Sequence, residues 1–395
     1  MSDWDKAARG AVNIEIDEHL RKRLQMGAFL RVKLGIDPSS PDIHLGHTVV
    51  LGKLRDFQEL GHQAVLIIGD FTARIGDPSG QSVTRRPLSE EEVEANAATY
   101  LEQVFKVLDR DLTEVRRQSE WYGDLDLAGV LRLASKATLA QITTRDDFRK
   151  RIEAGSPIGL HELMYPLMQG YDSVAIHSDV ELGGTDQLFN LMFGRDLQRE
   201  SGQEPQDVVT MPLLEGLDGV KKMSKSLGNY VGVTDPPAEM FGKLMSVPDG
   251  LIGRYMRLAA GMPEDEVTAH EGAMASGSNP RDAKIALARA IVTRFHDAGA
   301  ADQAQEAFAS QFKEGAMPEK MSEFPVSGFE ERGSVAAALA QTGLAKSLSD
   351  ARRLISQGGV KVDGRPVTDV NYKFDATPGA VLQVGKRHFA RVVEG

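Results

Sequence analysis

The stretch from residue 30 to residue 68 constrains the fold most, because its hydrophobic pattern changes period twice. Apolar residues alternate over 30–36, recur at helical spacing over 49–60 and form a continuous run over 64–68. Gly61 follows the helical segment, where a glycine commonly ends a helix. A strand, a helix and a second strand in this order form a β-α-β unit with a parallel crossover. We therefore expect an α/β fold with a Rossmann-type parallel sheet.

The loop between the first strand and the helix carries two short motifs, Gly35–Pro38 (GIDP) and His44–His47 (HLGH). The free N–H groups of a helix N-terminus favour an anionic ligand, and Gly46 leaves room for a ligand ring against the backbone. Taken alone, a capped helix start with two solvated histidines is an equally good interpretation. Lys222–Ser226 (KMSKS) then appears much later in the chain. The two motifs, in this order, resemble the HIGH and KMSKS motifs of class I aminoacyl-tRNA synthetases.

Two turn-rich loops place acidic residues beyond expected strand ends, where open α/β sheets bind ligands. Asp77, in the stretch 69–80, suits an ammonium group or, equally well, backbone N–H donors in a turn. Asp186, in a strand-to-helix turn over 183–187, suits the hydroxyls of a ribose. The chain has no P-loop motif, so a nucleotide must be held in another way.

Three polar residues share one face of a predicted helix in the segment 161–174. Tyr165, Gln169 and Asp172 lie at positions i, i+4 and i+7. A solvated face is one interpretation, but we favour a polar array directed into a pocket. Pro166 predicts that the helix starts or kinks at that point.

Most of the remaining chain up to residue 333 is predicted to be helical or irregular. We expect a polar helical segment over 1–28, a helix over 90–108 that begins with the capping pair Ser89 and Glu92, a mainly helical inserted connection over 110–155, a helical domain beyond 236 and a linker over 318–333.

The C-terminal segment has a different character, with two short helices over 334–345 and 349–357 followed by strands at 360–362, 381–384 and 389–393. Its pattern ARRLIxQGGVxVDG resembles the alpha-L RNA-binding motif. Residues 334–395 have nine Lys and Arg against five Asp and Glu, whereas the rest of the chain has 37 against 52. A basic tail on an acidic body indicates an anionic partner, although a basic appendage that binds no RNA is the alternative.

Length and composition bound the remaining possibilities. A chain of 395 residues predicts two or three domains. The absence of cysteine excludes disulfides, thiolate metal sites and cysteine nucleophiles, and we expect no metal site. No apolar run reaches transmembrane length, and the first residues lack the features of a signal peptide. We expect a cytoplasmic protein with no membrane contact.

Over its whole length the chain resembles the bacterial tyrosyl-tRNA synthetases, through stretches such as GIDPSSPDIHLGH, IIGDFTARIGDPSG, MYPLMQGYDSVAI, ELGGTDQ and KKMSKSLGN. The resemblance implies a Rossmann-type catalytic domain over 1–228, a helical anticodon-binding domain over 229–325 and an S4-type alpha-L domain over 333–395. It also implies a tyrosine–tRNA ligase that forms tyrosyl-adenylate from L-tyrosine and ATP with Mg²⁺, then transfers tyrosyl to tRNA(Tyr). A homodimer without a tightly bound cofactor is implied as well.

The resemblance assigns roles to residues of four kinds. The catalytic residues are His44, His47, Lys222 and Lys225. The ATP-binding residues are Ser39, His44, Gly46, His47, Gly183, Asp186, Lys222, Lys225 and Ser226. The tyrosine-binding residues are Asp37, Asp77, Tyr165, Gln169, Asp172 and Gln187, with Asp172 at the phenol. The tRNA-binding residues are Arg85, Arg86, Arg352, Arg353, Lys361, Lys386 and Arg387.

Two positions depart from the family pattern. Part of the family has a tyrosine that contacts the phenol where this chain has Lys33, so Asp172 is expected to act with a water or another donor. Many members have a basic residue where this chain has Gln81, and we expect Arg85 and Arg86 to replace its contact.

Three rival functions share some of these features. A tryptophanyl-tRNA synthetase has the same fold and both motifs, but that family lacks the basic C-terminal module and the Tyr165, Gln169 and Asp172 set. Nucleotidyltransferases with H-x-G-H are usually shorter and carry no RNA-binding module. A non-catalytic RNA-binding paralogue is disfavoured by the intact histidines and lysines of the two motifs.

Overall fold

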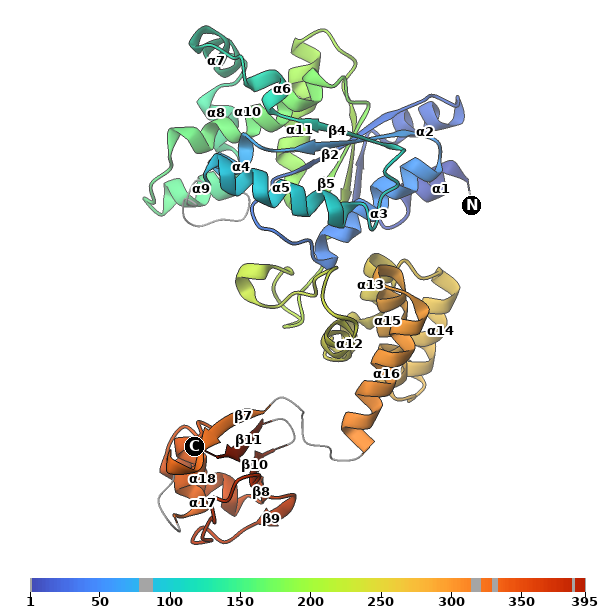
Figure 1. The fold of residues 1–395 in the computed structure, drawn as a ribbon. Helices are drawn as coiled ribbons and strands as arrows, with labels where there is room; N and C mark the ends of the chain where they lie inside the picture. The colour runs from blue at the N-terminus through green and yellow to red at the C-terminus, as the bar shows by residue number, and fades with distance from the viewer. Residues whose placement is uncertain (1, 78–87, 314–320, 329–332, 386–387, 395) are drawn as a thin grey trace. The chain divides into compact units, whose positions relative to one another are not determined.

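The computed structural model describes residues 2–77, 88–313, 321–328, 333–385 and 388–394 (Figure 1). Contacts divide the chain into two compact units, residues 1–305 and 306–395. Arg85 and Arg86, Gln81, and Lys386 and Arg387 lie outside the described residues, so the predictions for them stay predictions.

The first unit is built on a six-stranded sheet in the order β1-β6-β5-β2-β3-β4, in which only β1 runs antiparallel to its neighbour. The strands are β1 (Asn13–Glu15), β2 (Arg31–Ile36), β3 (Gln63–Ile68), β4 (Thr113–Arg117), β5 (Val180–Gly184) and β6 (Asp207–Met211). α3 (Leu45–Glu59) connects β2 to β3 along the chain, and the two strands pair in parallel. This confirms the predicted β-α-β unit and parallel sheet.

The helices of this unit cover both faces of the sheet. α3 packs on one face, and α10 (Leu160–Ala175) and α11 (Leu188–Glu200) pack together on the other (Figure 1). The remaining helices are α1 (Asp3–Ala8), α2 (Asp17–Gln25), α4 (Thr72–Ile75), α5 (Glu90–Val104), α6 (Ser119–Tyr122), α7 (Leu127–Ala134), α8 (Leu139–Thr143), α9 (Asp146–Glu153), α12 (Pro237–Met245), α13 (Ile252–Tyr255), α14 (Glu264–Ala275) and α15 (Pro280–Phe295), while α16 (Ala298–Lys313) runs past residue 305.

The strand order reverses between β2 and β5. After β2 the chain adds β3 and β4 on one side, and then returns to add β5 and β6 on the other. The two loops that leave the carboxyl ends of β2 and β5 therefore diverge, which opens a crevice between them.

Several predicted elements need correction. The segments 1–28 and 110–155 each contain a strand, β1 and β4, and these form the two edges of the sheet. All five residues of β4 are partly exposed, and charged side chains on an edge strand hide the alternation that marks a buried one. The helix around Pro166 begins earlier, at Leu160, because Glu162 accepts the backbone N–H of Gly159 and caps that first turn.

The second unit contains a five-stranded sheet, in the order β7-β11-β10-β8-β9, and helices that follow β7 in the chain. Its elements are β7 (Ser322–Pro325), α17 (Val335–Gln341), α18 (Leu348–Ser356), β8 (Val360–Val362), β9 (Arg365–Val367), β10 (Val381–Val384) and β11 (His388–Val393). β8 and β9 form a hairpin through Asp363 and Gly364, which both have positive φ as its two-residue turn requires. The predicted linker over 318–333 is wrong in part, because β7 pairs in parallel with β11.

Candidate active site

A cavity of about 610 Å³ opens at the carboxyl ends of β2 and β5, where the strand order reverses. It is lined by every residue that the sequence assigned to ATP or tyrosine: Asp37, Ser39, His44, Gly46, His47, Asp77, Tyr165, Gln169, Asp172, Gly183, Asp186, Gln187, Lys222, Lys225 and Ser226. The fold therefore brings both motifs and the polar helix face around one space. The ligand that each residue contacts remains a prediction.

The two histidines of the first motif lie at the N-terminus of α3 with their rings stacked, 3.8 Å between centroids. His44 Nδ1 accepts the N–H of Gly46 and His47 Nδ1 accepts the N–H of His44, each at 3.2 Å. A nitrogen that accepts a hydrogen bond carries no proton, so each neutral ring has its proton on Nε2.

Both rings are neutral at pH 7. Burial, and then the charges of His47 and Lys225, lower the pKa of His44 to about 2. Burial, and then the charges of Lys225 and Lys222, lower the pKa of His47 to about 4. Each ring therefore lines the cavity as a neutral group with one N–H donor.

The second motif places two ammonium groups at the same cavity. Lys222 Nζ lies 3.0 Å from Asp186 Oδ2, and Lys225 Nζ lies 3.1 Å from Asp42 Oδ2. Burial lowers the pKa of Lys225, while its hydrogen bond to Asp42 opposes that change. The cavity thus has two neutral donors and two cations close to a helix N-terminus, a set that suits a polyphosphate.

A buried carboxylate, that of Asp172 on α10, lines the cavity away from this cationic end. Its Oδ2 accepts a hydrogen bond from Gln118 Nε2 at 2.8 Å, and its Oδ1 accepts one from Trp121 Nε1 at 3.1 Å. Burial raises its pKa to about 7, and the positive charge of Lys33 is the largest opposing influence. A carboxylate held in this way is suited to accept a hydrogen bond from a hydroxyl group.

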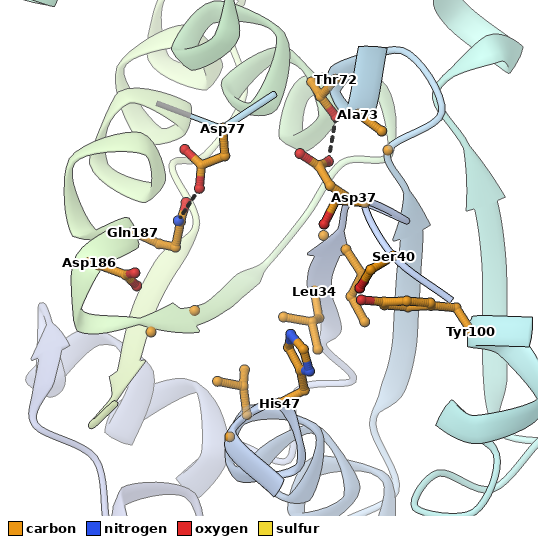
Figure 2. Close-up of a pocket in the computed structure, with 18 of the residues that line it drawn as sticks. Leu34, Asp37, Ser40, His47, Thr72, Ala73, Asp77, Tyr100, Asp186 and Gln187 are labelled. Atoms are coloured by element: carbon orange, nitrogen blue, oxygen red, sulfur yellow. Dashed lines mark hydrogen bonds between the residues drawn. The ribbon is translucent and has the colours of Figure 1, made fainter. Parts of the chain in front are cut away.

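Two further carboxylates face each other across the cavity (Figure 2). On one side, Asp37 accepts hydrogen bonds from Thr72 Oγ1 and from the hydroxyl of Tyr165, both at 2.7 Å. On the other side, Asp77 accepts one from Gln187 Nε2 at 2.8 Å. Carboxylates of this kind suit a ligand that carries an ammonium group, through charge-assisted hydrogen bonds.

Sequence reasoning missed five side chains that hold these groups: Thr72, Gln118, Trp121, Arg145 and Asn190. Arg145 is buried, lies 3.4 Å from Asp77 and donates to Asn190, which in turn donates to Gln169. Gln118 and Trp121 lie within four residues of the end of β4. A sequence prediction of that strand would therefore have indicated them as residues near a ligand site. Arg145, at the start of α9, and the buried amide of Asn190 carry no comparable sequence signal.

The residues predicted to bind tRNA that the structure describes all lie in the second unit. Arg352 and Arg353 on α18 and Lys361 on β8 are exposed, and Arg353 donates to Asp350. Their exposed charges are compatible with phosphate contacts, which remain a prediction.

A family model described as tRNA synthetases class I (W and Y) matches residues 25–313, a range that contains every residue of the cavity. The chain belongs to this family. Tyrosine–tRNA ligase from Colwellia psychrerythraea is 51% identical over 398 residues, which cover 99% of each chain. Tyrosine–tRNA ligase from Moorella thermoacetica is 55% identical over 379 residues, 96% of this chain and 91% of that protein.

The C-terminal module and the fold agree with membership among the class I tRNA synthetases. An S4 domain model matches residues 335–381, as the alpha-L pattern predicted. The crystal structure of tyrosyl-tRNA synthetase complexed with L-tyrosine from Archaeoglobus fulgidus superposes with a TM-score of 0.62 at 25% identity, covering 76% of this chain and 98% of that one. Plasmodium falciparum tryptophanyl-tRNA synthetase, at 16% identity and a TM-score of 0.58, shares the fold.

Two absences concern only the part of this class I synthetase that the structure describes. Within it, no helix has both the length and the apolar character needed to cross a bilayer. Nor do its His, Asp and Glu side chains form a group of three or more that could hold a metal ion.

Proposed function

We propose that the protein is a tyrosine–tRNA ligase, an aminoacyl-tRNA synthetase that forms tyrosyl-adenylate from L-tyrosine and ATP and then esterifies tRNA(Tyr). The observation that carries this proposal is the buried carboxylate of Asp172 in the cavity of a class I synthetase. A phenol hydroxyl donates to such a group, whereas a phenylalanine ring would leave it without that donor. The relatives at 51% and 55% identity bear the same activity in their names.

In the first step, a carboxylate oxygen of tyrosine attacks the α-phosphorus of ATP and the bond to pyrophosphate breaks. The phenol hydroxyl donates to Asp172, and the ammonium group lies between Asp37 and Asp77, so the tyrosine carboxylate is presented toward the two histidines. The protein makes no covalent bond, and catalysis consists of positioning and charge stabilisation.

The cationic end of the cavity stabilises the transition state of this step. The Nε2–H groups of His44 and His47 donate to phosphate oxygens, and Lys222 and Lys225 hold the departing pyrophosphate. The neutral rings cannot lose a proton to the phosphate at neutral pH, so they act as donors and not as acids. Mg²⁺ bound together with ATP would neutralise part of the phosphate charge.

In the second step, a ribose hydroxyl at the 3′ end of the tRNA attacks the tyrosyl carbonyl and AMP leaves. The S4 module supplies phosphate contacts through Arg352, Arg353 and Lys361, which hold the tRNA but take no part in the chemistry. We also propose that the protein works in the cytoplasm, as a protein that charges tRNA for translation there.

We also propose that two copies of this chain associate as a homodimer. Large apolar side chains are exposed on four helices that follow one another in the chain: Leu127 and Leu131 on α7, Leu139 on α8, Ile152 on α9 and Leu160 on α10. α7 and α8 both contact α10, and α8 contacts α9, so these side chains share one region of the surface. An exposed apolar region of this kind is typical of a protein interface.

The decisive experiment is ATP–pyrophosphate exchange with each of the standard amino acids in turn, followed by charging of tRNA. We expect exchange with tyrosine and charging of tRNA(Tyr). Exchange that prefers tryptophan would contradict the proposal, and so would tRNA binding without exchange by any amino acid. Molar mass by light scattering tests the homodimer, with Leu131→Asp expected to give a monomer.

A further inference from the structure

Lys33 on β2 is fully buried, and the mechanism above does not use it. Its Nζ donates to Ser173 Oγ at 2.8 Å and to the carbonyl oxygen of Gln169 at 2.9 Å. It also lies 2.8 Å from Glu181 Oε1 on β5, the strand next to β2. The ammonium group thus ties α10 to the central strands of the sheet.

Lys33 is close in the chain to residues of the cavity wall, because Leu34 and Gly35 of the same strand line the cavity. Alternate residues of a strand share a face, so Gly35 lies on the same face of β2 as Lys33. Gly35 lines the cavity together with Gln118 and Asp172, and a Cβ at Gly35 would meet no atom within 4 Å. Gly35 therefore forms an open part of the cavity wall, and Lys33 is the preceding residue on the same face of β2.

Stability alone does not account for this lysine. A buried ion pair costs so much desolvation that apolar residues of similar volume often stabilise a protein equally well or better. The partners of Lys33 on α10 are Gln169 and Ser173, which lie on either side of Asp172 within about one helical turn. The lysine is therefore bonded to the part of α10 that carries the carboxylate.

We propose that Lys33 is a positioning residue for the amino-acid end of the cavity: paired with Glu181, it anchors α10 through Gln169 and Ser173 and keeps Asp172 as a carboxylate that accepts the phenol hydroxyl. The inference rests on the proposed function and adds to it the residue that sets the specificity for a hydroxylated ring.

The charges around Asp172 support this role. Lys33 faces it from β2, Glu181 from β5 and Tyr122 from α6, while the uncharged Gln118 and Trp121 donate hydrogen bonds to it. Burial raises the pKa of Asp172 to about 7, the charge of Lys33 lowers it and the charge of Glu181 raises it. Without the lysine, the carboxyl would hold its proton at neutral pH and would no longer accept the phenol hydroxyl as a carboxylate does.

The test compares Lys33→Met, Glu181→Gln and the double variant in tyrosine-dependent ATP–pyrophosphate exchange between pH 6 and 9. Both variants that lack the lysine should raise KM for tyrosine by about 10- to 100-fold, the usual effect of losing hydrogen bonds to a charged group. They should also lower the preference for tyrosine over phenylalanine, with KM for ATP close to that of the wild type.

The pH profile separates this role from a purely structural one, because the two single variants should shift it in opposite directions. The decline of kcat/KM for tyrosine at low pH should move upward by about one pH unit in Lys33→Met and downward in Glu181→Gln, since one charge nearby shifts a carboxyl pKa by about 1–3 units. A defect of packing would not produce opposite shifts.

A matched control is another buried lysine pair, Lys53 with Asp56 on α3, where Nζ and Oδ2 are 2.8 Å apart. Lys53→Met combined with Asp56→Asn should leave the kinetics of tyrosine unchanged. If Lys33→Met does not fold, the double variant, which leaves no unpaired charge, decides the matter.

Wild-type KM and wild-type preference for tyrosine in the double variant would overturn the proposal, and so would equal losses in the Lys53 control. The proposed function fails separately, if the wild-type enzyme itself does not exchange pyrophosphate with tyrosine.

Discussion

Lys222 of the KMSKS motif and Asp186 of the strand-to-helix turn form an ion pair, with 3.0 Å between Nζ and Oδ2. We expect Lys222 to bind a phosphate of ATP and Asp186 to bind its ribose. The two residues thus neutralise each other's charge in the structure. We expect ATP binding to replace their ion pair by two contacts, one from Lys222 to a phosphate and one from Asp186 to the ribose.

That contact makes Asp186→Asn informative. The variant should raise KM for ATP by about tenfold or more, since a hydrogen bond to a charged group is lost, and should change KM for tyrosine little. Steady-state pyrophosphate exchange measures both constants. The matched control is Asp196→Asn on α11. This variant removes an ion pair between Asp196 and Arg199, both of which are exposed. An unchanged KM for ATP would show that Asp186 does not bind the nucleotide.

Lys225→Ala should slow adenylate formation by roughly 10²–10³-fold and leave tyrosine affinity nearly unchanged, because its contact with phosphate is made mainly in the transition state. Stopped-flow rates and equilibrium dialysis with tyrosine distinguish the two effects. Lys6→Ala, which removes a surface ion pair with Glu59, serves as the control. A loss confined to tyrosine affinity would contradict the assignment.

His44 and His47 should stay neutral over the working pH range. In ¹⁵N spectra of the histidine rings, both should show the proton on Nε2 and no titration between pH 5.5 and 8. Titration of either ring near pH 6.5 would be inconsistent with the structure.

The same two histidines predict how stability depends on pH. Their folded-state pKa values lie below the value of about 6.5 for an unfolded histidine, so the unfolded chain binds protons first as the pH falls. Their contribution to the free energy of unfolding should be complete above about pH 6.5 and should decrease from there toward pH 4. Urea unfolding of the wild type and of His47→Gln at pH 7 and pH 5 measures it, with a smaller pH effect expected in the variant.

Asp172→Ala should greatly lower the activation of tyrosine and narrow its margin over phenylalanine. A site built to hydrogen-bond a hydroxyl group rejects the analogue that lacks it by about 10⁴–10⁵, which sets the scale for this comparison. The ratio of kcat/KM values for the two amino acids measures the effect. Preference for tyrosine equal to that of the wild type would remove Asp172 from the specificity site.

Ending the chain after Lys313 should separate adenylate formation from tRNA charging. Every residue of the cavity is retained, so pyrophosphate exchange should stay near normal, provided that circular dichroism shows a folded protein. Charging should decline, and tRNA affinity should depend less steeply on salt. In the full chain, replacing Arg352, Arg353 and Lys361 by Ala should reduce the log–log salt slope by about 0.7–0.9 for each lost phosphate contact. Unchanged charging and salt slope would show that this module does not hold the tRNA.

The sequence by itself determined the features that depend on short spacing along the chain. The alternating and helical periods over 30–68 predicted the β-α-β unit, and the i, i+4, i+7 spacing placed Tyr165, Gln169 and Asp172 on one face of α10. Such patterns are readable because strand and helix periods act within a few residues. The two motifs likewise identified the family, which the comparisons show.

Only the tertiary structure decided which distant side chains meet. β4 became the edge of the sheet despite its charged sequence, and this brought Gln118 to Asp172. The alignment of β2 with β5 placed Glu181 beside Lys33. These contacts depend on strand order and register, which local periodicity does not encode. The protonation of Asp172 and of the two motif histidines depends on burial, a property that a chain acquires only when it folds.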